Sequence, residues 1–216
     1  MSDFFAQFNP SQPAWEFMWV ILLFFVAMVA ITVERLIYIY ARANVHAPRF
    51  MAEIRKLVAA GDFKKAISYC KSAGERALPM VVLAALTEAE RREFIDFRAI
   101  QNAVDEASLE IIPRLNRRTG WLTTIGNIST LTGLLGTIVG LIISFKAVGD
   151  PRAAVGGGTA ALAAGISVAM FTTMWGLIVA IPSIFFYTVI TNKTQSILDD
   201  IDEHSVKLIH LLTGGK

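Results

Sequence analysis

Hydrophobic positions continue without an intervening charge through two long segments of the chain. No charged residue occurs from Thr119 to Phe145 or from Ala153 to Asn192. A hydrocarbon core about 30 Å thick needs roughly 20 apolar residues in a helix that rises about 1.5 Å per residue. Each segment is therefore long enough to cross a membrane once. The glycine, serine and threonine residues within both segments are typical of membrane helices that pack against protein.

A third apolar segment lies near the start of the chain. Phe17–Val33 is uncharged, and the apolar run resumes after Glu34-Arg35 as far as Ile39. The first eight residues contain no Lys or Arg and no small-residue cleavage site follows, which argues against a cleavable signal peptide. The pattern predicts an all-α polytopic membrane protein with three transmembrane helices, a long helical insert and a C-terminal helix.

The basic residues are distributed unevenly along the chain. Of the 20 Lys and Arg residues, 15 lie between Glu34 and Arg118, whereas the first 16 residues have none. Because basic loops stay in the cytoplasm, this asymmetry predicts that the N-terminus lies outside and that the C-terminus lies in the cytoplasm. The expected segments are an outside N-terminus at 1–14, transmembrane helices at 15–39, 121–146 and 160–190, a cytoplasmic insert at 40–120, an outside loop at 147–159 and a cytoplasmic helix at 191–216.

The insert reads as helices joined by short breaks. Residues 48–60 and 62–72 form an expected helical hairpin that turns at Gly61, with Asp62 as the N-cap of its second helix. After Gly74 and Pro79 a longer helical pattern begins. Pro113 is expected to kink this pattern without ending it, so that the helix continues into the second span.

Two apolar stripes at helical spacing follow this pattern. The insert carries Phe97, Ile100, Val104, Ala107 and Ile111, and the tail carries Ile197, Ile201, Leu208 and Leu212. Packing of the tail on the insert of the same chain is the favoured interpretation, and dimerisation through the insert stripe is the alternative.

The polar segments show no enzymatic, metal or cofactor signature. A nucleic-acid surface is disfavoured because acidic residues accompany the basic ones in the insert, leaving a net charge of +2. The glycines at 156–158 are not followed by the Lys-Ser/Thr pair of a phosphate-binding loop. His46, His204 and His210 are scattered, and the single Cys70 is expected to be a reduced thiol. We therefore expect no enzyme activity, no metal and no cofactor.

Small and polar residues line one face of each of the later spans. Thr137 and Thr173 fall near mid-depth, and with Thr172 and Ser144 they are candidates to line an ion path. A membrane threonine commonly bonds to its own helix, so that interpretation stays open. Glycines at this spacing allow two backbones to approach closely. The expected packing residues are Gly133, Gly136, Gly140, Gly165, Gly176 and Pro182.

Neither later span contains a titratable group at depth, where a charge costs roughly 2.5–3.5 kcal/mol on insertion scales. A proton relay needs such a group, so any ion transfer here would use an ionisable residue of a partner. Glu34 and Arg35 form an expected interfacial pair at the inner end of the first span. An anchoring role is favoured for this pair over a direct relay role of Glu34.

Several of these residues fall in runs that resemble the MotA/TolQ/ExbB proton-channel family. The second span contains Gly-Leu-Leu-Gly-Thr-Ile-Val-Gly at 133–140, and the third contains Gly165-Ile-Ser and Gly176-Leu-Ile-Val-Ala-Ile-Pro182. Ile-Pro-Arg-Leu at 112–115 and Glu34-Arg-Leu also fit. Three spans with a large insert after the first are similar to the ExbB/TolQ branch. The resemblance is specific over about residues 112–192 and architectural elsewhere.

The resemblance implies an ion-driven motor subunit of the bacterial inner membrane that uses the proton-motive force to energise an envelope process. The outside N-terminus at 1–14 and the outside loop at 147–159 are then periplasmic. The resemblance also implies a homopentamer around single-span partners of the ExbD/TolR type, whose membrane aspartate takes up protons, with Thr137 and Thr173 lining the path. It leaves room for a TonB/TolA-like protein as a further partner. The driven process and the choice of H⁺ or Na⁺ stay open.

One position departs from the pattern of the resemblance. Val168 stands where many ExbB and TolQ sequences place a glutamate. The missing carboxylate favours an alternative function, a non-conducting membrane scaffold of the same architecture. A small transporter is a weaker alternative, because the spans lack inverted repeats and a broken helix.

Overall fold

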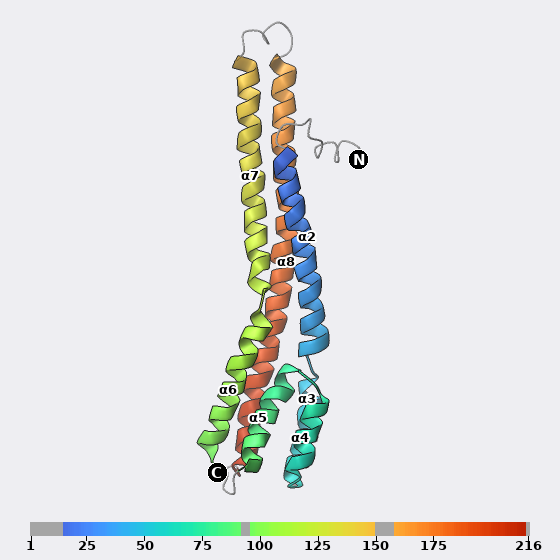
Figure 1. Ribbon diagram of the computed structural model, residues 1–216, viewed down its shortest axis with the longest axis vertical. Coiled ribbons are helices and arrows are strands. Elements are labelled where there is room, and N and C mark those ends of the chain that lie inside the picture. Colours follow the sequence, from blue (N-terminus) through green and yellow to red (C-terminus); the bar gives the residue numbers. More distant parts are fainter. Residues whose placement is uncertain (1–14, 92–95, 150–157, 215–216) are drawn as a thin grey trace. The chain divides into compact units, whose positions relative to one another are not determined.

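The computed structural model describes residues 15–91, 96–149 and 158–214, and the described part is helical without any strand. Its elements are α2 (Trp15–Ile37), the π-helix η1 (Tyr38–Ala43), α3 (Ala47–Ala59), α4 (Phe63–Ser72), α5 (Ala77–Arg91), α6 (Phe97–Asn116), α7 (Thr119–Gly149) and α8 (Gly158–Leu212) (Figure 1). Three helices are long and apolar enough to cross a membrane. The all-α class and the three spans expected from the sequence are confirmed.

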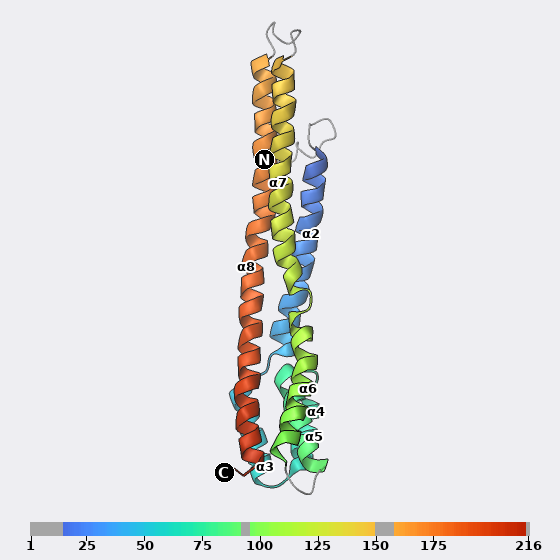
Figure 2. The same ribbon diagram turned by 90° about the vertical axis from the view of Figure 1, so that its left-hand side faces the viewer.

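The chain divides into two compact units. The span unit consists of Met1–Val33 and Arg118–Thr188, and the insert unit consists of Glu34–Arg117 and Val189–Lys216. In the span unit, α7 lies along the first part of α8 (Figure 2). Leu, Ile, Val and Phe side chains on the outer faces of α7 and α8 are exposed, including Leu131, Phe145 and Phe185. Such a surface suits lipid or a neighbouring apolar chain.

The insert unit is a set of helices that pack in chain order, α3 on α4, α4 on α5 and α5 on α6. The predicted hairpin is confirmed: α3 and α4 are joined at Gly61, whose φ of 75° is the left-handed conformation that glycine adopts without strain. Asp62 occupies the predicted N-cap position, but its side chain makes no cap bond and instead accepts a hydrogen bond from Lys65. This pairing lowers the pKa of Asp62.

The longer helical pattern of the insert consists of two helices, which corrects one expectation. Pro79 lies within the first turn of α5, where its missing N–H costs no hydrogen bond. The side chain of Asp96 caps α6 by accepting from the backbone N–H of Arg98 at 3.0 Å. Ile100, Val104 and Ile111 are buried as predicted. Phe97 is 48% exposed, so its inclusion in the buried stripe is wrong.

The expected continuation of the insert helix into the second span is also corrected. Helix α6 passes through Pro113, as predicted, and ends at Asn116. Arg118 then adopts a φ of 61°, which breaks the regular helical hydrogen bonding before α7 begins at Thr119. Arginine has no preference for this conformation, so the residue type at position 118 could not predict that the helix breaks there.

The third span and the C-terminal helix are one continuous helix, although the sequence suggested a boundary at 190/191. Helix α8 has 55 residues, and no glycine or proline occurs between Pro182 and its end at Leu212. The four predicted apolar residues of the tail are buried: Ile197, Ile201, Leu208 and Leu212. The tail belongs to the same compact unit as the insert. Packing within one chain therefore accounts for its apolar stripe.

Candidate functional site

The small residues of the second and third spans face each other in the span unit. A Cβ on Gly176 would lie 2.7 Å from the carbonyl oxygen of Ser129 on α7. A Cβ on Gly133 would lie 2.9 Å from the carbonyl oxygen of Thr172 on α8. Separations this short occur only where backbones touch, so glycine is what allows α7 and α8 to pack closely.

The same contact continues toward the loop that joins the two helices. A Cβ on Gly140 would lie 3.1 Å from the carbonyl oxygen of Gly165. A side chain at Gly165 would in turn overlap the hydroxyl of Ser144. Numbers rise along α7 as they fall along α8, so the two helices are antiparallel. We call this contact, made by Gly133, Gly136, Gly140, Gly165 and Gly176, the glycine interface.

Serine also joins the two helices, by a bond that sequence reasoning missed. Ser183 is fully buried, and its hydroxyl donates a hydrogen bond of 2.6 Å to the carbonyl oxygen of Leu122. Pro182, beside it, is half-buried within α8, which continues through it. The imide nitrogen of Pro182 cannot donate a hydrogen bond to the preceding turn of α8. The next residue, Ser183, contributes the hydrogen bond to α7 described above.

The four candidate hydroxyls occupy two kinds of position. Thr172 is 1% exposed, and its hydroxyl donates to the carbonyl oxygen of Ala169 at 2.8 Å. Ser144 is fully buried, and its hydroxyl donates to Gly140 at 2.8 Å. Both residues therefore lie inside the glycine interface with their hydroxyls bonded to their own helices. Their burial favours a packing role over contact with a hydrated path.

Thr137 and Thr173, by contrast, keep part of their surface accessible. The Thr137 hydroxyl donates to the carbonyl oxygen of Leu134 at 2.6 Å. A Cβ on Gly136 would lie 2.7 Å from the Cβ of Thr172. Because the helices are antiparallel, Thr137 and Thr173 lie on opposite sides of this contact along the helix axis. Both hydroxyls are thus partly accessible and lie on an uncharged stretch of their helices.

Glu34 and Arg35 have different surroundings at the inner end of the first span. Glu34 is exposed, whereas Arg35 is 3% exposed in the insert unit. The guanidinium of Arg35 donates to the carbonyl oxygen of Leu115 and lies over the ring of Tyr38, 5.0 Å from its centroid. Leu115 lies in the last turn of α6, where carbonyl groups lack helical partners and attract positive charge. Arg35 therefore links the start of the insert unit to the last turn of α6.

Val168 occupies a buried position on the third span, with 4% of its surface exposed. Its neighbour Ala169 is equally buried and lies against Gly140 of the glycine interface. The position at which the resemblance leads us to expect a carboxylate is therefore occupied here by a buried apolar side chain.

Comparison with known proteins is consistent with these helices and motifs. The sequence model of the MotA/TolQ/ExbB proton channel family matches residues 75–203, which is more than half of the chain. A biopolymer transport protein ExbB homolog from Methanothermobacter thermautotrophicus is 26% identical over 169 residues, 78% of this chain and 57% of that protein. The chain therefore spans little more than half the length of this relative.

Two further relatives are similar over most of their own length. The ExbB-like 3 protein of Synechocystis sp. is 31% identical over 163 residues, 74% of this chain and 73% of that protein. The biopolymer transport protein ExbB of Aquifex aeolicus is 30% identical over 121 residues, 56% of this chain and 78% of that protein. With its three apolar helices, the chain is a multi-pass membrane protein that belongs to the MotA/TolQ/ExbB proton channel family.

Proposed function

We propose that this chain is an ExbB/TolQ-like subunit of an ion-driven motor in the bacterial inner membrane. In this function it assembles as a homopentamer around single-span partners of the ExbD/TolR type and takes part in the transport of biopolymers. One elementary charge that crosses 100 mV releases roughly 2.3 kcal/mol, so each stroke uses several ions. A TonB/TolA-like protein is the natural recipient of the motion.

The observation that carries this proposal is the partial accessibility of Thr137 and Thr173 on the two packed spans. The two residues flank the contact between Gly136 and Thr172, both are partly accessible, and no charged residue occurs nearby on either helix. A hydroxyl both donates and accepts hydrogen bonds, so it can pass water or contact a partner carboxylate without titrating. The partner's membrane aspartate supplies the ionisable group that these spans lack. Thr172 and Ser144 support the path from within the glycine interface.

The topology that fits this function places residues 1–14 and 147–159 in the periplasm. Residues 40–120 and 191–216 are then cytoplasmic, and 15–39, 121–146 and 160–190 cross the membrane. The concentration of basic residues between Glu34 and Arg118 supports this orientation.

Ion flux into liposomes that contain this subunit and its single-span partner tests the proposal. Thr→Val keeps the shape of the side chain and removes the hydroxyl, so Thr137→Val and Thr173→Val should abolish flux while Thr→Ser retains it. Thr124→Val is the matched control on α7, because Thr124 is exposed and its hydroxyl bonds to its own helix, at 3.2 Å from the Gly120 carbonyl oxygen. Wild-type flux from both Thr137→Val and Thr173→Val would refute the path.

The second candidate function is a non-conducting scaffold, and the buried Val168 is the observation that favours it. A scaffold needs the glycine interface but no hydrated hydroxyls. Under this alternative both valine variants assemble and behave as wild type. Valine variants that assemble fully but conduct no ions would count against the scaffold function.

A further inference from the structure

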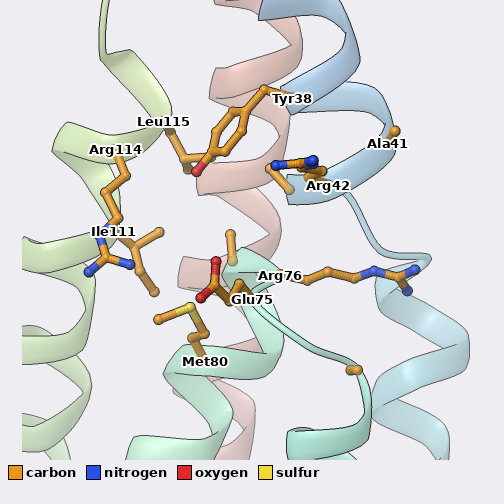
Figure 3. Close-up of a pocket in the computed structure, with 12 residues that line it drawn as sticks. Tyr38, Ala41, Arg42, Glu75, Arg76, Met80, Ile111, Arg114 and Leu115 are labelled. Carbon is orange, nitrogen blue, oxygen red and sulfur yellow. The ribbon is translucent and has the colours of Figure 1, made fainter.

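Two cavities adjoin each other in the insert unit and share Ala73 and Arg76 in their linings. The first, which we call the Tyr38 cavity, measures about 300 Å³ and lies between η1, the start of α5 and the end of α6 (Figure 3). The second, which we call the Arg49 cavity, measures about 280 Å³ and lies between the loop before α3, the first turn of α3 and the end of α4. Their electrostatic characters differ.

The Tyr38 cavity holds charges of both signs. Figure 3 shows the carboxylate of Glu75 directed into it, below the Tyr38 ring. Arg42 also lines this cavity, while Arg114 at its edge is paired with Glu110. The side chain of Arg76 extends away from Glu75 and Tyr38 (Figure 3). An anion in this cavity would meet the Glu75 carboxylate, so the Tyr38 cavity is a poor site for a negative ligand.

The Arg49 cavity is lined by two guanidinium groups and by no carboxylate. Arg49 and Arg76 contribute to its wall together with the imidazole of His46, and none of its lining residues is Asp or Glu. Phe50 and Tyr69 form an aromatic side of the cavity, with rings stacked 5.4 Å apart between centroids. Tyr69 is 38% exposed, so a ligand can reach this aromatic surface.

We propose that the Arg49 cavity binds the phosphate group of an anionic ligand. Guanidinium groups match phosphate oxygens with paired N–H donors, and Arg49 and Arg76 reach the cavity from different elements. The start of α3 adds to the attraction, because His46 makes no side-chain cap bond there and the first turn contains no acidic residue. The Arg49 cavity adjoins the Tyr38 cavity, and Tyr38 directly follows α2, the first of the apolar spans, along the chain. A phosphate site close in sequence to the end of a span suits a phospholipid headgroup. A free phosphate compound presents the same chemistry.

Native mass spectrometry of the full chain distinguishes the two sources. The protein is purified in detergent and supplied with phosphatidylglycerol or with phosphatidylcholine, and retained lipid is counted. In parallel, inorganic phosphate is titrated calorimetrically against chloride at equal ionic strength. Preferential retention of phosphatidylglycerol assigns the cavity to a headgroup. Binding of inorganic phosphate without lipid preference assigns it to a soluble phosphate compound.

A charge-matched pair of double variants tests whether this cavity is responsible. Arg49→Gln with Arg76→Gln should weaken the binding about tenfold or more for each guanidinium removed. Lys64→Gln with Lys71→Gln removes the same charge from exposed positions of α4 that do not line the cavity and should bind as wild type. Circular dichroism checks that both variants stay folded. Absence of both phosphatidylglycerol preference and phosphate binding, or equal losses in the two variants, would overturn the proposal. It stands independently of ion conduction.

Discussion

Arg35, at the inner end of the first span, donates a hydrogen bond to the backbone carbonyl of Leu115, which lies 80 residues later in the last turn of α6. Its guanidinium is almost completely buried and also covers the ring of Tyr38. A charged group is buried only where partners compensate its lost hydration. The bond therefore identifies Arg35 as a structural residue of the insert unit.

Arg35→Met should destabilise the insert unit by about 2 kcal/mol, because it removes a charge-assisted bond and leaves the Leu115 carbonyl without this donor. Chemical unfolding of the purified protein, followed by circular dichroism, measures the change. Arg98→Met is the control, since Arg98 is an exposed arginine on the same insert and its side chain can be lost at little cost. Equal unfolding midpoints for the two variants would contradict the role assigned to Arg35.

Gly176→Ala should destabilise the span unit by roughly 1–3 kcal/mol, because its Cβ would press on the backbone oxygen of Ser129 at 2.7 Å. Gly120→Ala adds the same methyl group to α7, where nothing lies within 4 Å. That change should be neutral or stabilise the helix by up to about 1 kcal/mol. Thermal unfolding in detergent micelles separates the two, and similar midpoints would count against the glycine interface.

Val168→Glu should destabilise the chain by roughly 3 kcal/mol, because a carboxylate would replace a methyl-bearing side chain at a buried membrane position. Val168→Thr keeps the shape and lets the hydroxyl bond to its own helix, so its effect should be small. The unfolding midpoints of both variants are compared with that of wild type. Wild-type stability in the glutamate variant would show that water reaches position 168 in the assembled protein.

Cys70 should resist thiol reagents in the native protein. Its side chain is 1% exposed, and burial raises the pKa of its thiol from 9.0 to about 12. Because the pKa is higher in the folded than in the unfolded protein, burial of the neutral thiol favours the folded state at neutral pH relative to high pH. This contribution to the free energy of unfolding is fully present below pH 9 and is lost as the pH rises toward 12. Reaction with a maleimide at neutral pH should be slow until denaturant is added. Rapid labelling of the folded protein would disprove the burial.

The proposed orientation has to be tested with a different cysteine, because a buried thiol reacts slowly with a labelling reagent on whichever side of the membrane it lies. Lys64→Cys in a Cys70→Ala background places a thiol on the exposed face of α4. An impermeant reagent should label it only after the cells are permeabilised. Labelling of intact cells would reverse the proposed topology.

Local patterns were enough to predict the spans, the turn at Gly61 and the buried tail stripe, since each depends on spacing or on one residue type. The continuity of α8 and the left-handed Arg118 were not predictable in this way. No residue type marks either feature, so the surrounding structure decides them. The burial of Arg35 was missed for a related reason: a charged side chain beside a span is expected at the surface, and its acceptor lies far away in the sequence.

The candidate site was predictable as a pair of small-residue faces, but the exposure of its hydroxyls was not. Successive helical residues are about 100° apart, so the neighbours Thr172 and Thr173 belong to one broad face in the sequence. The contacts with α7 decide that Thr172, which lies against Gly136, is enclosed and that Thr173 keeps an accessible surface.

The glycine interface also constrains which mutations the chain tolerates. Glycine is the smallest residue, so every missense change at these five positions adds atoms to a contact between two backbones. No choice of replacement is conservative there, whereas the leucines and isoleucines on the outer faces can exchange with one another at little cost. A complete substitution library should therefore show depletion of every replacement at codons 133, 136 and 140 of α7 and at codons 165 and 176 of α8.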